Sequence, residues 1–300
     1  RSTIIRYRSG KVGRVYLAKD EQYRIYRKLD KKNSILEDSF LLKEDRFFRY
    51  HPGFNPISLM KAFGRFIKNG RVINGGSTIT MQLARILEPK PRTVVSKIKE
   101  ILRAVQFEFR FSKDEILEMY LNYAPFGKNL VGYETASLYF FGLPVEELTP
   151  AQTATLANLP QIPGVDFFKN KDLLKRKRNR LLKTLYLRDH LKYKHFKSSI
   201  NEKIGIGHHK FAMEIPHLSD MLMLSQERYD YSTTIDRELQ NFVESKIEDY
   251  LSSLEAKGIS HISVVLMENK TGKIRAITGS GGYFSSSEGQ VRGFQGIRQP

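Results

Sequence analysis

Apolar and polar positions divide this chain into stretches with different periodicities. Up to about residue 37, basic and apolar residues alternate, which predicts short strands or an extended lead-in. From there to about residue 190, apolar residues recur every three or four positions, which predicts helices. After residue 230 an amphipathic helix precedes two apolar runs, 262–267 and 274–278, separated by a Gly-containing turn, which predicts a β-hairpin. We expect a mainly α-helical domain followed by the beginning of an α+β domain.

Two helices in the middle stretch have clear start signals. Ser112 and Glu115 form a capping box at the start of one apolar-periodic segment. Thr149 and Gln152 form another, with Pro150 at the first helical position, where its missing N–H costs nothing. The sequence therefore predicts helices that begin just after Ser112 and Thr149.

Two further segments have one apolar side. In the first, five apolar residues share helical spacing, so we expect them to form a buried face. They are Val94, Ile98, Ile101, Leu102 and Val105. The second segment, 56–68, has three cations on one stripe and apolar residues roughly opposite. Its pattern is typical both of a core-facing helix and of a helix lying in an anionic membrane surface, and the sequence leaves both open.

Composition excludes several classes of site. The chain has 300 residues, 40% of them hydrophobic, and no cysteine, which excludes disulfide frameworks, thiolate zinc sites and cysteine nucleophiles. The longest uncharged run, 148–165, contains three prolines and cannot be a membrane-spanning helix. The chain opens on Arg1 without a signal peptide, which indicates a segment of a longer protein.

The net charge is +18, which favours a polyanionic partner. Between residues 169 and 203 there are thirteen lysines and arginines against three acids. No zinc-finger spacing, aromatic RNA-reader motif or basic heptad accompanies this run, so we expect no nucleic acid partner. A connector facing anionic lipid head groups is the preferred interpretation of the basic run.

Glu44 and Asp45 are the first candidate catalytic residues. They lie between closely spaced apolar side chains, which would desolvate a carboxylate and raise its pKa toward general acid or base use. The alternative is an acidic pair on a solvated helix surface. His51 follows a few residues later, and we interpret it as a residue that makes a structural hydrogen bond and not as a ligand.

A glycine-rich segment, 74–85, is the second candidate. Its paired glycines allow close backbone approach, and the helix that follows presents free N–H groups suited to a phosphate. Thr78, Gln82 and Arg85 share one face of that helix. The alternative is a glycine turn followed by an N-cap serine, Ser77.

Cations gather just after this segment. Arg85, Arg92 and Lys97 lie within thirteen residues, and Glu100 is three positions beyond Lys97, so the last two are neighbours on a helix. The pair is either an ordinary surface ion pair of little energetic value or part of a diphosphate clamp.

Five segments together resemble the transglycosylase domain, glycosyltransferase family 51, of class A penicillin-binding proteins. They are residues 44–53, 75–85, 97–100, 112–122 and 136–142, in the family's order and spacing. The resemblance covers residues 38 to about 165, and Met81 with the segment 124–129 is most similar to the 1c subtype. Ser96 stands where the family often has a basic residue.

This resemblance implies a lysozyme-like helical fold and an inverting enzyme that polymerises lipid II into glycan strands at the periplasmic face of the cell membrane. It implies that Glu44 is the general base and that Glu100 lies near the donor diphosphate, directly or through a divalent cation, Mg²⁺ or Mn²⁺. The residues expected to bind substrate are Asp45, Ser77, Thr78, Gln82, Arg85, Arg92 and Lys97. No organic cofactor is implied. Expected partners are lipid II, the growing glycan strand, the membrane surface and other cell-wall synthesis proteins.

The expected domains are an N-terminal lead-in over 1–37, the glycosyltransferase domain over 38–190, a basic linker over 191–229 and the start of a penicillin-binding transpeptidase domain over 230–300. The chain ends before a Ser-x-x-Lys nucleophile motif in the right context, so we expect it neither to acylate penicillin nor to cross-link peptides.

Two alternative functions remain at this point. A lysozyme-like enzyme that cleaves glycan would also need a buried Glu, but it has no use for the cations. A non-catalytic, basic protein that binds membranes or nucleic acid would be recognised by strong salt-sensitive binding to duplex DNA.

Overall fold

The computed structural model describes residues 1–29, 34–57, 59–60, 76–91, 93–160, 170–225, 228–254, 257–284 and 289–296. The chain forms two compact units. We call Gln22–His209 the helical unit, and Arg1–Glu21 with Lys210–Pro300 the mixed unit. Arg92 and most of the expected amphipathic helix at 56–68 lie outside the described residues.

The helical unit confirms the predicted mainly α-helical domain. Its elements are β3 (Tyr23–Arg24), α1 (Ser34–Glu44), α3 (Ile79–Leu87), α4 (Val94–Arg110), α5 (Lys113–Tyr123), β4 (Leu130–Val131), α6 (Tyr133–Phe141), the short 3-10 helix η1 (Val145–Glu147), α7 (Pro150–Leu156), α8 (Lys171–Leu187) and α9 (Tyr193–Asn201). Both predicted capping boxes are present, with Ser112 capping α5 and Thr149 capping α7. Strands β3 and β4 pair in parallel.

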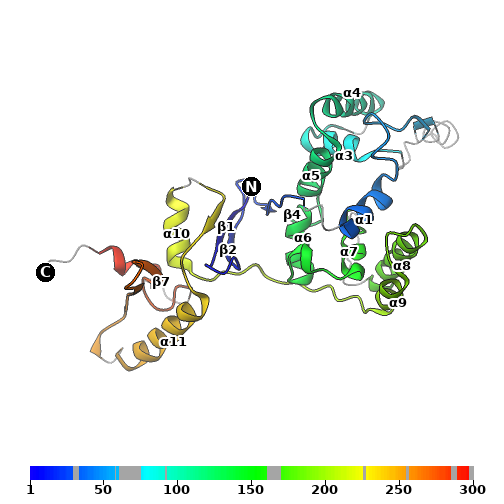
Figure 1. Ribbon diagram of the computed structural model, residues 1–300. Helices are drawn as coiled ribbons and strands as arrows, with labels where there is room; N and C mark the ends of the chain where they lie inside the picture. Colours follow the sequence, from blue (N-terminus) through cyan, green and yellow to red (C-terminus); the bar gives the residue numbers. More distant parts are fainter. Residues whose placement is uncertain are drawn as a thin grey trace. The chain divides into compact units, whose positions relative to one another are not determined.

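The helices of this unit pack in two groups (Figure 1). Helix α3 packs against α4 and α5, and buries Ile79, Met81 and Leu83. Helix α1 packs against α7 and α8, and α9 packs against the same two helices. The last residue of α1 reaches α3 through a side-chain hydrogen bond, so the end of α1 connects the two groups.

The apolar face expected on α4 is buried only in part. Ile101 and Val105 are partly buried, but Val94, Ile98 and Leu102 are 57%, 54% and 60% exposed, and Ala104 is the fully buried residue of this helix. The side of α4 that faces α3 is instead mostly polar, because Lys97 bonds to Ser77 and Glu108 bonds to Thr80. Polar contacts therefore hold α4 against α3 and the segment before it, and the part of the apolar stripe with Val94, Ile98 and Leu102 is exposed.

The mixed unit combines the N-terminal segment of the chain with its C-terminal part. Its elements are β1 (Thr3–Arg6), β2 (Val12–Tyr16), α10 (Pro216–Ser225), β5 (Asp230–Ser232), α11 (Arg237–Leu254), β6 (Val264–Glu268), β7 (Lys273–Thr278) and the 3-10 helix η3 (Gly293–Gln295). Strand β1 pairs antiparallel with β2 and parallel with β5. Strands β6 and β7 form the predicted antiparallel hairpin.

These units differ from the domain boundaries expected from the sequence. The lead-in, 1–37, is divided between them, because β1 hydrogen-bonds to β5 more than 220 residues later. The segment expected as a linker, 191–229, contains α9 of the helical unit and α10 of the mixed unit. Strand pairing across the chain, which local composition does not report, sets this division.

One cation of the basic run is structural. Arg178 on α8 is 1% exposed and donates from its guanidinium to the carbonyl oxygens of Ile200 and Glu202 at 3.2 and 2.8 Å. These carbonyls lie at the C-terminal end of α9, where helix carbonyls lack intrahelical partners. Arg178 therefore attaches α9 to α8, whereas Lys171, Lys175 and Arg180 on the same helix are exposed.

Gly53 lies where the loop after α1 passes close to α4. Its φ is +92°, and a Cβ atom at this position would lie 2.8 Å from the backbone carbon and oxygen of Ala104. Its carbonyl oxygen accepts a hydrogen bond from the Thr78 hydroxyl at 2.6 Å. The missing side chain therefore allows this loop to touch α4 and the start of α3 together.

Gly53 and Gly127 offer a matched comparison, because Gly127 has a φ of +91° but nothing within 4 Å of the added Cβ. Gly127→Ala should lower the free energy of unfolding by about 1–2 kcal/mol, the cost of the left-handed backbone alone. Gly53→Ala should cost about 1–3 kcal/mol more, because it also overlaps the α4 backbone. Urea denaturation followed by circular dichroism measures both; equal losses would contradict the close contact.

Candidate active site

Three helices meet at the carboxylate of Glu44. Glu44 is the last residue of α1 and is half-buried. Gln82 on α3 donates from Nε2 to Glu44 Oε2 at 3.1 Å. Tyr120 on α5 donates its hydroxyl to Gln82 Oε1 at 3.4 Å. Because the amide oxygen is taken by the tyrosine, the amide N–H is directed at the carboxylate.

Tyr120 is suited to this donor role at all ordinary pH values. Burial raises the pKa of Tyr120 well above its usual value; the negative charge of Glu44 adds to the rise, and the positive charge of Arg85 opposes it. The phenol therefore stays protonated. Because both charges act on Tyr120, Glu44 and Arg85 both lie close to this buried side chain, which is 1% exposed.

Asp45 is the internal anchor of the site. Its Oδ2 accepts the backbone N–H of Ile79 at 3.0 Å and lies 2.8 Å from His51 Nε2. Both side chains are buried. Ile79 is the first residue of α3, so this oxygen satisfies an N–H that has no partner inside the helix. Asp45 thus joins the end of α1 to the start of α3.

Thr78 caps α3, and not Ser77 as in the alternative interpretation of this segment. The Thr78 hydroxyl accepts the backbone N–H of Met81 at 3.1 Å and donates to the Gly53 carbonyl at 2.6 Å. The cap therefore falls one residue later than in that interpretation, because Thr78 bonds both to the helix and to the Gly53 loop. This leaves the Ser77 hydroxyl to bond elsewhere.

Ser77, Lys97 and Glu100 form a second polar group. Lys97 on α4 donates from Nζ to Ser77 Oγ at 2.7 Å and to Glu100 Oε2 at 2.9 Å. The side chains of Lys97 and Glu100 are 30% and 12% exposed. The pair predicted from their spacing is therefore confirmed, and it lies partly buried against the segment that precedes α3.

Arg85 shares one face of α3 with Thr78 and Gln82, as their spacing predicts. It is half-buried in the last turn of the helix. The structure therefore brings together Glu44, Gln82 and Arg85 around Tyr120, and Ser77, Lys97 and Glu100 beside the start of α3. The sequence carries no local signal of the bond from Tyr120 to Gln82, which are 38 positions apart.

Within the described ranges, no three His, Asp or Glu side chains are grouped as metal ligands. None of the described helices has the length and apolarity needed to cross a bilayer.

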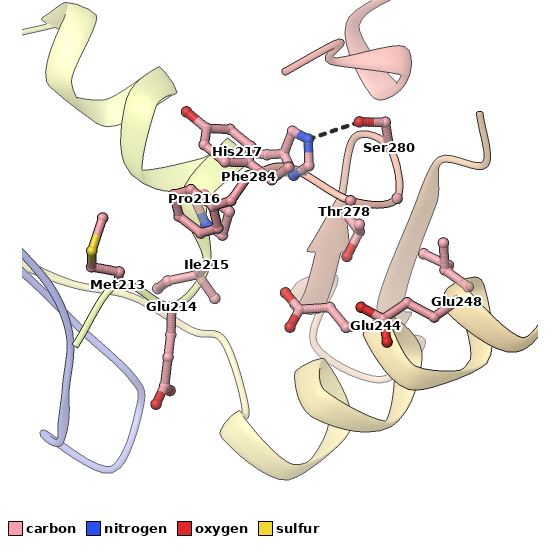
Figure 2. Close-up of a pocket in the computed structure, with 14 residues that line it drawn as sticks. Met213, Glu214, Ile215, Pro216, His217, Glu244, Glu248, Thr278, Ser280 and Phe284 are labelled. Atoms are coloured by element: carbon pink, nitrogen blue, oxygen red, sulfur yellow. Dashed lines mark hydrogen bonds between the residues drawn. The ribbon is translucent and has the colours of Figure 1, made fainter. Parts of the chain in front are cut away.

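A cavity of about 350 Å³ lies in the mixed unit, between the start of α10, helix α11 and the loop after β7 (Figure 2). None of the residues expected at the site lines it. His217 donates from Nε2 to the Gly289 carbonyl at 2.9 Å and lies 3.2 Å from the Ser280 hydroxyl. Burial lowers the pKa of His217, so the ring is neutral at pH 7. The acids at the cavity are Glu214, Glu244 and Glu248, and Arg237 pairs with Glu214 at 2.7 Å.

The anchoring role of Asp45 makes a prediction about stability. Asp45→Ala should lower the free energy of unfolding by about 2–4 kcal/mol, because a buried N–H and a buried imidazole lose their partner. Asp114→Ala is the control, because that carboxylate forms an exposed ion pair with Arg49 worth about 1 kcal/mol or less. Chemical denaturation compares the two variants, and similar losses would argue against the anchor.

The burial of Glu244 predicts how the stability of the mixed unit depends on pH. Burial raises the pKa of Glu244 above its usual 4.5, with Glu214 and Glu248 adding and the hydrogen bond from Gln240 opposing. A carboxyl with a raised folded-state pKa contributes stability below its unfolded pKa and loses it as the pH rises through the folded value. Glu244→Gln should therefore raise the melting temperature at pH 7 and lose this advantage below about pH 4. A pH-independent difference in thermal unfolding would refute this.

The chain is similar to known proteins over most of its length. The sequence model of the family described as Transglycosylase matches residues 10–186. Penicillin-binding protein 1C of Escherichia coli strain K12 is 33% identical over 86% of this chain and 33% of that protein. Penicillin-binding protein 1A of Aquifex aeolicus is 30% identical over 80% of this chain and 35% of that protein.

Among solved structures, penicillin-binding protein 1A from Haemophilus influenzae is matched with a TM-score of 0.39 and 17% identity, over 90% of this chain and 32% of that one. The chain spans about a third of the length of the curated relatives it matches. The family match covers more than half of the chain and includes Glu44, Gln82, Lys97 and Glu100. This chain belongs to the transglycosylase family, whose domain is the glycosyltransferase domain of class A penicillin-binding proteins.

Proposed function

We propose that this chain is a peptidoglycan glycosyltransferase that polymerises lipid II into β-1,4-linked glycan strands. Membership of the transglycosylase family supports the reaction class. The observation that carries the proposal is the half-buried Glu44 carboxylate, which accepts a hydrogen bond from Gln82 and shares the neighbourhood of Tyr120 with Arg85.

Glu44 is the proposed general base. Its carboxylate takes the proton of the acceptor sugar's 4-hydroxyl, and the freed oxygen attacks the anomeric carbon of the donor. The new C1–O4 bond forms as the bond from C1 to the diphosphate oxygen breaks, and the diphosphate leaves with that electron pair. Attack opposite to the leaving group inverts the anomeric centre. The Gln82 hydrogen bond orients the carboxylate for this step.

Lys97 and Arg85 are the proposed contacts to the leaving diphosphate. Lys97 is held by Ser77 and Glu100 before any substrate binds, so little reorganisation is needed when charge develops on the phosphate. Arg92, which lies outside the described residues, belongs to the same clamp in this proposal. Ser77 would contact the donor together with Lys97.

Glu100 is the residue that would hold a divalent cation, which would supply further charge neutralisation to the diphosphate. The Glu100 oxygen Oε2 already accepts from Lys97, so a cation there would share this carboxylate with the lysine. The chemistry proposed above uses only the side chains of the chain itself.

Asp45 and Thr78 act as positioning residues in this proposal. Both make internal hydrogen bonds at the start of α3, so they hold Ser77 and Gln82 in place for the substrate. Their contribution to substrate binding is therefore indirect.

We further propose that the enzyme works at the periplasmic face of the cell membrane. The exposed cations of α8, among them Lys171, Lys175 and Arg176, support a surface that faces anionic lipid head groups. In this proposal residues 230–300 belong to a transpeptidase domain, other cell-wall synthesis proteins are the protein partners, and nucleic acid is not a ligand.

The test is polymerisation of labelled lipid II in detergent. Glu44→Gln keeps the shape of the side chain but removes the base, so kcat should fall by about 10²–10⁴-fold while the fold is retained. Glu147→Gln, on the exposed surface of η1, is the control and should keep full activity.

Two outcomes would contradict the proposal. One is full polymerisation by the Glu44→Gln variant. The other is native protein that cleaves finished glycan but forms no strand from lipid II, which would favour the lysozyme-like alternative. Circular dichroism of each variant separates loss of chemistry from loss of fold.

A further inference from the structure

Lys43 occupies an inward-facing position on α1. Leu36, Phe40 and Lys43 follow one another at intervals of four and three residues, so they share a helix face. Leu36 and Phe40 are 1% and 0% exposed, and α1 packs against α7 and α8. Lys43 is therefore half-buried at the edge of a packed interface, one residue before Glu44. Partial burial of an ammonium group is unfavourable unless an opposite charge compensates it.

Helix α8 brings two more cations to the same place. Asp38 on α1 hydrogen-bonds to His190, just after α8, at 2.8 Å, whereas Lys43 near the end of α1 interacts with Lys177 and Arg180, earlier on α8. The two packed helices therefore run antiparallel. Lys177 lies three residues after the buried Leu174, at the flank of the inward face of α8. Arg180 is three residues further and lies on the same side.

The positive charges of Lys177 and Arg180 act on Lys43. Burial lowers the pKa of Lys43, and Lys177 and Arg180 lower it further, while Glu44 opposes the change. The acids nearest on α1 are engaged elsewhere, because Glu37 bonds to Arg49 and Asp38 bonds to His190. Across the ranges that the structure describes, no carboxylate forms an ion pair with Lys43, Lys177 or Arg180.

Three cations with only the neighbouring Glu44 carboxylate to oppose them carry excess positive charge, which costs stability, and a bound anion removes that cost. We propose that Lys43, Lys177 and Arg180 form a binding site for a phosphate-type oxyanion beside Glu44, on the α8 side. This site is distinct from the Lys97 group, which is built on α4 and the start of α3. That the phosphate is the diphosphate of the acceptor substrate rests on the proposed function, because Glu44 must lie at the acceptor's hydroxyl.

The test compares two double variants on one helix. Lys177→Gln with Arg180→Gln removes two charges of the cluster. Lys171→Gln with Lys175→Gln also removes two charges, but from the opposite side of α8, about 150–190° around the helix axis from the side that carries Lys177 and Arg180. Both are made in the native chain and in a Lys97→Met background, which weakens the other proposed phosphate contact.

Calorimetric titration with inorganic diphosphate in the Lys97→Met background measures the site without any turnover. The cluster variant should bind diphosphate about tenfold or more weakly, because it loses charge-assisted hydrogen bonds, and the opposite-face variant should bind within about twofold of its parent. Without diphosphate, the cluster variant should melt no lower than its parent, because charge repulsion has been relieved. Equal binding by both variants would overturn the site.

Activity and vesicle binding assign the source of the phosphate. In the native background, the cluster variant should raise KM for lipid II about tenfold with kcat within about twofold, if the phosphate belongs to the acceptor. Loss of binding to phosphatidylglycerol vesicles beyond that of the opposite-face variant, with KM unchanged, would overturn the assignment to the acceptor and assign the site to a lipid head group.

The failures of the two proposals are distinguishable. If the native chain binds diphosphate through the cluster but forms no glycan, the oxyanion site is supported and the glycosyltransferase proposal is contradicted. If the native chain polymerises lipid II and both double variants bind diphosphate as it does, the glycosyltransferase proposal is supported and the oxyanion site is contradicted.

Discussion

The buried carboxylate of Asp45 is the interaction on which the arrangement of the site depends. One of its oxygens serves both the first N–H of α3 and the ring of His51, so the end of α1, the loop after it and the start of α3 are fixed together. Glu44 precedes this anchor by one residue, and Ser77 and Gln82 lie on the segment that the anchor holds. The Glu44 carboxylate and its surrounding polar groups can therefore keep a constant geometry although they come from distant parts of the chain.

The net charge of the protein comprises cations with different structural roles. Arg178 is buried and joins α8 to α9 through carbonyl oxygens. Lys97 is ordered by a serine and a carboxylate, in the manner expected of a group that receives developing negative charge. Lys43 is half-buried, and burial and the charges of Lys177 and Arg180 lower its pKa. The bulk value of +18 does not distinguish these roles.

The orientation of α4 shows how polar contacts can override an apolar pattern. Lys97 and Glu108 on this helix bond to Ser77 and Thr80, and three residues of the apolar stripe, Val94, Ile98 and Leu102, are left exposed. A partly buried polar group without a hydrogen bond costs more free energy than an exposed aliphatic side chain does. The helix therefore takes the orientation that satisfies its polar residues.

The sequence by itself determined the features whose partners are close in the chain. The capping boxes at Ser112 and Thr149, the β6–β7 hairpin and the Lys97–Glu100 pair all follow from short spacings. Only the tertiary structure decided the cap at Thr78, the bonds from Tyr120 to Gln82 and from Gln82 to Glu44, and the division of the chain by the β1–β5 pairing. Periodicity reports which side of an element is apolar, but the partner that side meets depends on contacts between residues dozens or hundreds of positions apart.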